Sequence, residues 1–357
     1  MRPLILHVIF LTALQCGTER TLPKHIVFET LVVCDAKYFD IAQVYGDKDP
    51  PFYLALYFNS VNQRFNNIHG TTIRFFVVKI VAANQSDEAK VFTFHTRGGT
   101  TYVNATASLP KLKTYAKQLE NFTDVDAVVL LTSYPTFYKD PNVPDHDRPP
   151  ITITPGDAYF GGVCTDHKVA ISQDDGKFSG IENTARQLAR LIGTPFDVPE
   201  GERGCSYYDD YMMGRGVWSD DRTRYQFSKC SSRAMKEHLL NISQSGCFDR
   251  KYQTSVNERH YKLVPGSVFN TVEDYCRLVT KTDDIYKVYS CTFRSRGNYY
   301  ERHFRDCEIR CCTYWGPFYW WFDEGPFTRP APDGMTCAYQ KVCLNRYCVR
   351  TPNNYTL

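Results

Sequence analysis

The stretch from Glu182 to Asp197, ENTARQLARLIGTPFD, has the spacing of a zinc-binding helix and turn but not its ligands. Two His side chains four residues apart on a helix, with a third His after a glycine turn, can hold Zn²⁺, and a Glu next to the first His serves as the base. Here Arg186, Arg190 and Phe196 occupy the three ligand positions, and Gln187 occupies the position of the base.

These four residues are unsuited to zinc hydrolysis. A guanidinium stays protonated, offers no lone pair and repels a dication. Phe196 has no ligand atom, and Gln187 cannot accept a proton near neutral pH. We therefore expect no catalytic residues and no zinc. A relocated zinc site is not expected either, because no two of the remaining His have the H-x-x-x-H spacing: His25, His69, His95, His146, His167, His238, His260 and His303.

The elements around these positions are those of a helix followed by a tight turn. Apolar residues recur at helical spacing from Ile181 to Ile192. Gly193 is placed to end the helix in a left-handed conformation, and Pro195 prevents its continuation.

The two arginines allow two interpretations. Arg186 and Arg190 can fill the former metal cleft by pairing with nearby acids, such as Glu182 or Asp197. Alternatively, they form a pocket for an anion or a carboxylate.

The rest of the sequence predicts an α/β fold followed by a cysteine-rich module. Apolar, β-branched runs predict strands, and apolar residues at helical spacing predict helices, in the order β-α-β-β-α-β that gives a mixed sheet. The expected strands are 25–35, 72–83, 91–96 and 124–133, and the expected helices are 52–68, 109–122 and 233–243. The last quarter holds eight of the 14 cysteines and many aromatic residues, which is typical of a small disulfide-held module.

Composition and targeting signals indicate a secreted glycoprotein. A charged start at Arg2 and a short apolar run predict a signal peptide over 1–17, and no later segment is apolar enough to span a membrane. The net charge of +3 gives no indication of nucleic-acid binding. Five N-x-S/T sequons are candidate glycosylation sites: Asn84, Asn104, Asn121, Asn241 and Asn354.

Several short motifs, in order, give the sequence a family resemblance. They are FETLVVCD (28–35), DVDAVVLLT (124–132), GDAYFGGVC (156–164), YYDDYMMG (207–214), FSKCS (227–231) and DGMTC (333–337). Together they resemble the reprolysin (adamalysin-like) metzincin metalloproteases, most closely the secreted salivary forms of ticks. The resemblance implies a zincin-like domain of two subdomains around a cleft over residues 24–250, then a cysteine-rich module over 265–350. The sequence departs from the family in one further respect: we expect no long pro-domain, because the first expected strand begins at His25, soon after the signal peptide.

The same resemblance assigns roles to individual residues. Gly193 and Asp197 are retained from the zinc motif, and Met213 matches the methionine of the Met-turn. Disulfides are implied between Cys164 and Cys247 and between Cys205 and Cys230. Glu29 and Asp126 match two acids of a calcium site found in some members, so calcium is a possible cofactor. Cys34 has no implied partner and could link two protein molecules.

We therefore expect a catalytically inactive, secreted metalloprotease-like protein that binds extracellular or host proteins. The family analogy suggests anti-haemostatic or immune-modulating roles. One alternative is an active zinc metalloendopeptidase of the reprolysin family. Another is a scaffold or decoy for an active paralogue, disulfide-linked through Cys34.

Overall fold

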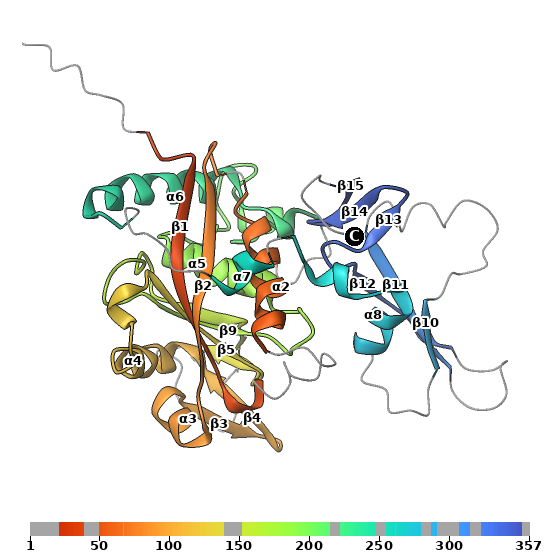
Figure 1. The fold of residues 1–357 in the computed structure, drawn as a ribbon, viewed down its shortest axis with the longest axis horizontal. Coiled ribbons are helices and arrows are strands. Elements are labelled where there is room, and N and C mark those ends of the chain that lie inside the picture. The colour runs from red at the N-terminus through yellow and green to blue at the C-terminus, as the bar shows by residue number, and fades with distance from the viewer. Residues whose placement is uncertain are drawn as a thin grey trace, which may run out of the picture.

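A computed structural model describes residues 21–38, 50–66, 68–138, 152–214, 222–247, 255–260, 262–279, 287–290, 307–314 and 323–351. They form an α/β body and, beside it, a module of short strands joined by disulfides (Figure 1). The predicted fold class, a mixed sheet with helices followed by a disulfide-rich module, is confirmed. The predicted signal peptide and Asn354 lie outside the described residues.

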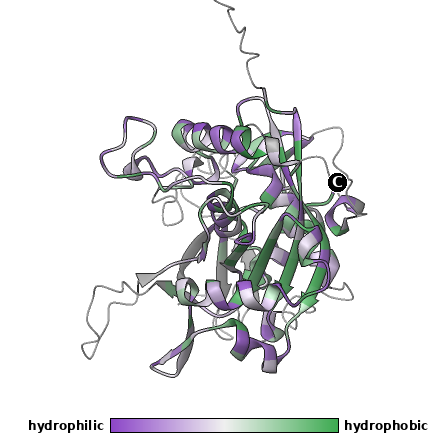
Figure 2. Cartoon of the chain, turned by 90° about the vertical axis from the view of Figure 1, so that its left-hand side faces the viewer, coloured by the Kyte–Doolittle hydropathy of each residue, from purple (hydrophilic) through white to green (hydrophobic). Residues whose placement is uncertain are grey.

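The central sheet has five strands in the order β2-β1-β5-β9-β8, of which only β8 is antiparallel to its neighbour. Its inner strands are mainly apolar, as expected for strands covered on both faces. Every residue of β5, AVVLLT, is buried, and the strands are mostly green in Figure 2. The strands are β1 (His25–Cys34), β2 (Thr72–Ala82), β5 (Ala127–Thr132), β8 (Gly156–Ala158) and β9 (Val169–Gln173).

Helices cover both faces of this sheet and create two cores. Alternate residues of β1 point to opposite faces, so Val32 packs with α2 and α5 while Leu31 and Val33 pack with α4. The helices of the body are α2 (Pro50–Gln63), α3 (Gln85–Val91), α4 (Ala105–Ala116), α5 (Ile181–Leu191) and α6 (Lys229–Ile242).

The region between β2 and β5 differs from the sequence prediction. Residue 91 ends α3 and does not begin a strand, and α4 begins at Ala105, four residues before the predicted start. The reason is helix capping by asparagines: Asn84 accepts the Asp87 N–H at 3.0 Å and Asn104 accepts the Ala107 N–H at 3.0 Å. A second sheet has the order β3 (Phe94–Arg97), β4 (Thr100–Asn104), β6 (Thr136–Tyr138) and β7 (Thr152–Ile153).

The C-terminal module has two three-stranded sheets and a small core of its own. Within the described residues, three disulfides hold it: Cys276–Cys311, Cys307–Cys343 and Cys337–Cys348.

No helix in the described part of the protein is long and apolar enough to cross a membrane. The elements that follow the body are α7 (Val256–Arg259), α8 (Val272–Val279), β10 (Lys287–Ser290), β11 (Glu308–Tyr314), β12 (Asp323–Pro330), β13 (Thr336–Ala338), β14 (Lys341–Leu344) and β15 (Tyr347–Arg350).

A buried ion network attaches this module to the body. Arg64, just after the end of α2, binds Glu182 on α5 at 2.6 Å and Asp333 of the module at 2.6 Å, and its side chain is only 3% exposed. Ser60 also donates to Asp333, at 2.8 Å. The module is therefore fixed to the first turn of the helix that carries the candidate site.

The segment between the two predicted domains is packed as well. The Asn59 side-chain amide donates to the backbone oxygens of His260 and Leu263 at 2.7 and 2.8 Å. Asn257 accepts the backbone N–H of Val77 on β2 at 2.8 Å. The segment around Asn257, His260 and Leu263 therefore packs against the body.

Candidate functional site

Helix α5 ends in the predicted glycine turn. The Gly193 backbone has φ +90°, its N–H donates to Arg190 O at 2.8 Å, and Thr194 N–H donates to Ala189 O at 3.0 Å. A Cβ at Gly193 would lie 2.7 Å from Cγ of His238 on α6. Glycine is required here by both the left-handed backbone and the close approach of α6.

The three positions that would carry zinc ligands meet in space, but they form a stack of two guanidiniums with one aromatic ring. The Cζ atom of Arg186 lies 4.5 Å from the centroid of the Phe196 ring, and that of Arg190 lies 4.3 Å from it. The ring attracts both cations through its quadrupole, which offsets part of the repulsion between two like charges one helical turn apart.

Arg186 is anchored to the backbone of the 207–214 loop. Its Nη1 donates to Met212 O at 2.8 Å and to Gly214 O at 2.7 Å. Burial lowers the pKa of Arg186 to about 10, so the group remains a cation at neutral pH. Arg186 thus crosslinks α5 to the loop that follows it.

The prediction that the two arginines pair with Glu182 or Asp197 is wrong, because these acids bind other residues. Glu182 pairs with Arg64, which follows α2, and Asp197 accepts hydrogen bonds from Ser228 and Ser231. The acid nearest Arg190 is Asp157 on β8, with Nε to Oδ1 at 3.9 Å, and burial lowers the pKa of Arg190.

Gln187 and Met213 are both buried. Gln187 is 2% exposed, and its Oε1 atom has no hydrogen-bond partner among the described residues. Met213 is fully buried in the core that also contains the apolar face of α5. Met213 therefore packs as a core residue.

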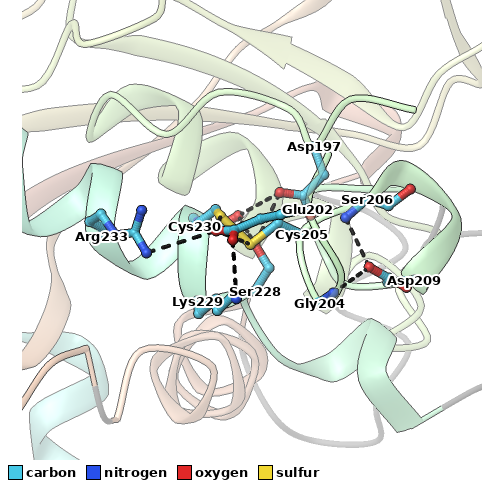
Figure 3. The surroundings of a disulfide bond; sticks show 11 residues. Asp197, Glu202, Gly204, Cys205, Ser206, Asp209, Ser228, Lys229, Cys230 and Arg233 are labelled. Carbon is cyan, nitrogen blue, oxygen red and sulfur yellow. Dashed lines mark hydrogen bonds and ion pairs between the residues drawn. A yellow bond between two sulfur atoms is a disulfide. The ribbon is translucent and has the colours of Figure 1, made fainter. Parts of the chain in front are cut away.

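Asp197 connects the turn to α6. Its N–H donates to Met213 O at 3.0 Å, and its Oδ1 accepts Ser228 Oγ at 3.0 Å and Ser231 Oγ at 3.3 Å (Figure 3). Burial raises the pKa of Asp197, while the two serine hydroxyls oppose that rise. The carboxylate holds the start of α6 behind the former ligand positions.

Two disulfides join the pairs that the family resemblance implies. Cys205–Cys230 ties the loop after the turn to α6, with Glu202 beside it 3.5 Å from Lys229 Nζ (Figure 3). Cys164–Cys247 joins the segment before α5 to the end of the body.

Zinc does not fit this site. Two protonated guanidiniums and a phenyl ring supply no ligand atom for a metal. In the described residues, each group of three His, Cys, Asp or Glu ligand atoms within 4.8 Å contains cysteines that are already in disulfides.

The two calcium candidates lie next to each other at the edge of β5. Asp126 N–H donates to Glu29 O at 2.8 Å, and the Asp126 carboxylate accepts the Glu29 N–H at 2.9 Å. Both residues are buried, at 6% exposure for Glu29 and 1% for Asp126. These contacts brace β1 against β5, and calcium binding by the pair stays a prediction.

Cys34 is an unbonded cysteine on β1 with 1% exposure. Burial raises the pKa of its thiol far above the usual range, with smaller contributions from Asp35 and Asp174. A thiol in this position cannot reach another protein molecule while the sheet is folded. Burial is therefore incompatible with the disulfide-linked dimer that the sequence allowed.

The sequons within the described residues lie at different kinds of position. Asn84 and Asn241 are exposed, whereas Asn104 and Asn121 are partly buried. Asn84 and Asn104 also cap helices through their side-chain oxygens. Glycosylation stays a prediction at all four.

Sequence reasoning missed a pocket of about 250 Å³ at the junction of the body and the module. Its lining comes from Arg64 after α2, the segment 175–182 that leads into α5, the segment 224–225, α8, and residues 329–333 and 346 of the module. No sequence motif could have indicated it, because these five segments are far apart in the sequence.

Comparison with known proteins supports a relationship to metalloproteinases. The chain is 24% identical over 361 residues to a Bombyx mori protein described as "A disintegrin and metalloproteinase with thrombospondin motifs like", in a match that covers 94% of this chain and 46% of that protein. The chain thus spans about half the length of that relative. No family model matches the sequence.

Two solved structures show a weak likeness to this fold. An archaemetzincin from Methanopyrus kandleri matches 59% of this chain and 95% of its own, at 13% identity and a TM-score of 0.35. A protein in the structure of a chaperone–substrate complex matches 61% of this chain and 36% of its own, at 10% identity and a TM-score of 0.34.

Proposed function

We propose that this chain is a metalloprotease-like protein that acts by binding extracellular proteins and does not hydrolyse peptides through zinc. The observation that carries this proposal is the stack of Arg186 and Arg190 on Phe196. These residues occupy all three ligand positions, and Gln187 replaces the base. Restoring zinc hydrolysis would therefore need four substitutions, not one.

The turn and the contacts around the stack match those of the zinc motif, although the ligand residues and the base do not. The glycine turn, the Asp197 hydrogen bonds and the Cys205–Cys230 disulfide all still shape the region around the stack. The partly exposed ring of Phe196, at 41%, and the two guanidiniums give this region an aromatic and cationic surface. Arg and aromatic residues are favoured at protein interfaces, which supports a binding role.

We further propose that the protein is secreted. Five disulfides within the described residues support folding in an oxidising compartment, and the N-terminal sequence predicts a signal peptide. The family resemblance suggests anti-haemostatic or immune-modulating partners, whose identity needs a direct binding experiment.

Metal content and proteolysis test the proposal. The purified wild type should hold no stoichiometric zinc by elemental analysis and should not cleave gelatin or fibrinogen. The matched variant Arg186→His/Gln187→Glu/Arg190→His/Phe196→His should gain zinc, because the backbone frame is retained. Stoichiometric zinc in the wild type, together with chelator-sensitive cleavage, would overturn the proposal.

A further inference from the structure

Exposed apolar side chains lie around the stack of Arg186 and Arg190 on Phe196. Seven large apolar side chains are exposed in the described residues, and four of them belong to segments that meet at this stack. Gly161 N–H donates to Arg190 O at 3.0 Å, and Tyr207 N–H donates to Val198 O at 3.0 Å. Apolar groups that are exposed together indicate an interaction surface. We name these four residues the stack patch: Phe160 (57% exposed), Phe196 (41%), Val198 (54%) and Tyr208 (62%).

The loop that carries Tyr208 has a fixed shape. The Asp209 carboxylate accepts the backbone N–H groups of Gly204 and Ser206 at 2.8 and 2.9 Å (Figure 3). The Cys205–Cys230 disulfide ties the same loop to α6. A surface whose shape is fixed before a partner arrives loses less conformational entropy on binding.

Arg190 is a cation beside the patch whose N–H groups have no hydrogen-bond acceptor in the described residues. Its side chain is 19% exposed, and its one ion pair there is with Asp157, at 3.9 Å from Nε to Oδ1, which is beyond hydrogen-bond distance. The Asp157 carboxylate already accepts the hydroxyl of Thr106 at 2.7 Å and the N–H of Ala158 at 2.8 Å. Asp157 therefore offsets part of the charge of Arg190 but leaves its N–H groups without an acceptor.

Arg186 differs from Arg190 in this respect. Two backbone oxygens of the 207–214 loop already accept hydrogen bonds from Arg186, at 2.8 and 2.7 Å. Of the two guanidiniums in the stack, Arg190 is therefore the one with donors left for a ligand.

A partner that covers the stack patch would remove the remaining water from Arg190. Burying a cation without an acceptor costs free energy, so such a partner must supply one. A carboxylate is the best suited acceptor, because it forms two parallel, charge-assisted hydrogen bonds with a guanidinium. The four apolar side chains around Arg190 require apolar contacts from the same partner.

We propose that the stack patch binds a protein segment in which an apolar side chain lies close to a Glu or Asp side chain, and that Arg190 binds the carboxylate. This inference rests on the proposed function, since it names the kind of partner that the same site binds. It assigns different roles to the two arginines: Arg190 binds the ligand, and Arg186 holds the loop.

Surface plasmon resonance with the full-length protein and short peptides tests this inference. The probes are acetylated and amidated peptides of alanine that carry one Phe and one Glu, one to three positions apart. Each has a counterpart with Gln for Glu and a counterpart with Ala for Phe. The test variants are Arg190→Gln and Phe160→Ser/Tyr208→Ser. The matched controls are Arg97→Gln, at an exposed arginine on β3, and Tyr339→Ser, at a tyrosine of the module that is 88% exposed. Thermal unfolding verifies that each variant is folded.

We expect at least one Phe–Glu peptide to bind at least about tenfold more tightly than its Gln and Ala counterparts. Arg190→Gln should bind the Glu and Gln peptides about equally, and the double variant should bind both about tenfold more weakly than the wild type does. A further variant, Arg190→Lys, keeps the charge but loses the planar fork, so it should retain only part of the preference for Glu. Both controls should bind like the wild type.

Four results would refute the inference. They are equal binding of Glu and Gln peptides to the wild type, no binding of any Phe–Glu peptide, a full preference for Glu in Arg190→Gln, and unchanged affinity in the double variant. The zinc and cleavage measurements separate these failures from a failure of the proposed function. Stoichiometric zinc with chelator-sensitive cleavage overturns the proposed function, whereas a zinc-free, inactive protein with no preference for Glu peptides overturns this inference alone.

Discussion

Replacing Asp333 by alanine removes the acceptor at the centre of the network that attaches the module to the body. The Asp333 carboxylate accepts Ser60 Oγ at 2.8 Å, Arg64 Nη1 at 2.6 Å and Asn345 N–H at 2.8 Å. Its side chain is 4% exposed and that of Arg64 is 3% exposed, so water screens the pair very little. Removing one partner of a buried pair costs about 3–5 kcal/mol, because the other charge stays buried.

Urea unfolding measures this cost. We expect Asp333→Ala to lower the free energy of unfolding by roughly 3 kcal/mol or more, a large share of the 5–15 kcal/mol that is usual for a domain. The control is Glu120→Ala, which removes the exposed partner of Lys79 and should change stability by less than ~1 kcal/mol. Limited proteolysis should cut Asp333→Ala first near the junction.

A double-mutant cycle separates the ion pair from the other contacts. Asp333→Ala combined with Arg64→Met should show a coupling energy above ~1 kcal/mol, because the two groups touch. A loss below ~1 kcal/mol in Asp333→Ala, or additive effects in the cycle, would refute the view that this pair fixes the module to the body.

Further changes test the site and the core. Phe196→Ala should lower the free energy of unfolding by about 1–2 kcal/mol, because two guanidiniums lose the ring on which they pack. An unchanged melting temperature would show that this stack does not stabilise the protein. Gly193→Ala should destabilise the protein by more than ~1 kcal/mol in urea, because its Cβ meets His238 and φ is +90°. Burial raises the pKa of Asp174 to about 6, so the Asp174 carboxyl group binds its proton more tightly in the folded state than in the unfolded state. The contribution of Asp174 protonation to the free energy of unfolding is complete below about pH 4 and is lost as the pH rises through about 6. Across this range the free energy of unfolding should therefore fall less in Asp174→Asn than in the wild type. Cys34 should resist iodoacetamide in the native protein and react in urea, as mass spectrometry of its peptide would show; native labelling would contradict its burial.

Local patterns predicted those parts of the fold that depend on neighbouring residues. The apolar spacing from Ile181 to Ile192 and the following Gly193 predicted α5 and its turn, because helix periodicity and left-handed backbone are properties of a few adjacent residues. Buried strands such as β5 were predicted for the same reason. Helix α3 was missed, because its start depends on the Asn84 cap and its apolar face is short.

The sequence by itself determined that Arg186, Arg190 and Phe196 cannot coordinate a metal, since a guanidinium stays protonated and a phenyl ring has no ligand atom. Only the tertiary structure decided what those residues do instead. Glu182 is the local partner of Arg186 by helical spacing, yet Arg64, 118 residues earlier in the sequence, takes it. Arg186 donates hydrogen bonds to the backbone oxygens of Met212 and Gly214 in the 207–214 loop. Spacing limits which charges can meet, but packing between distant segments decides which charges are buried, and a buried charge must find a partner there.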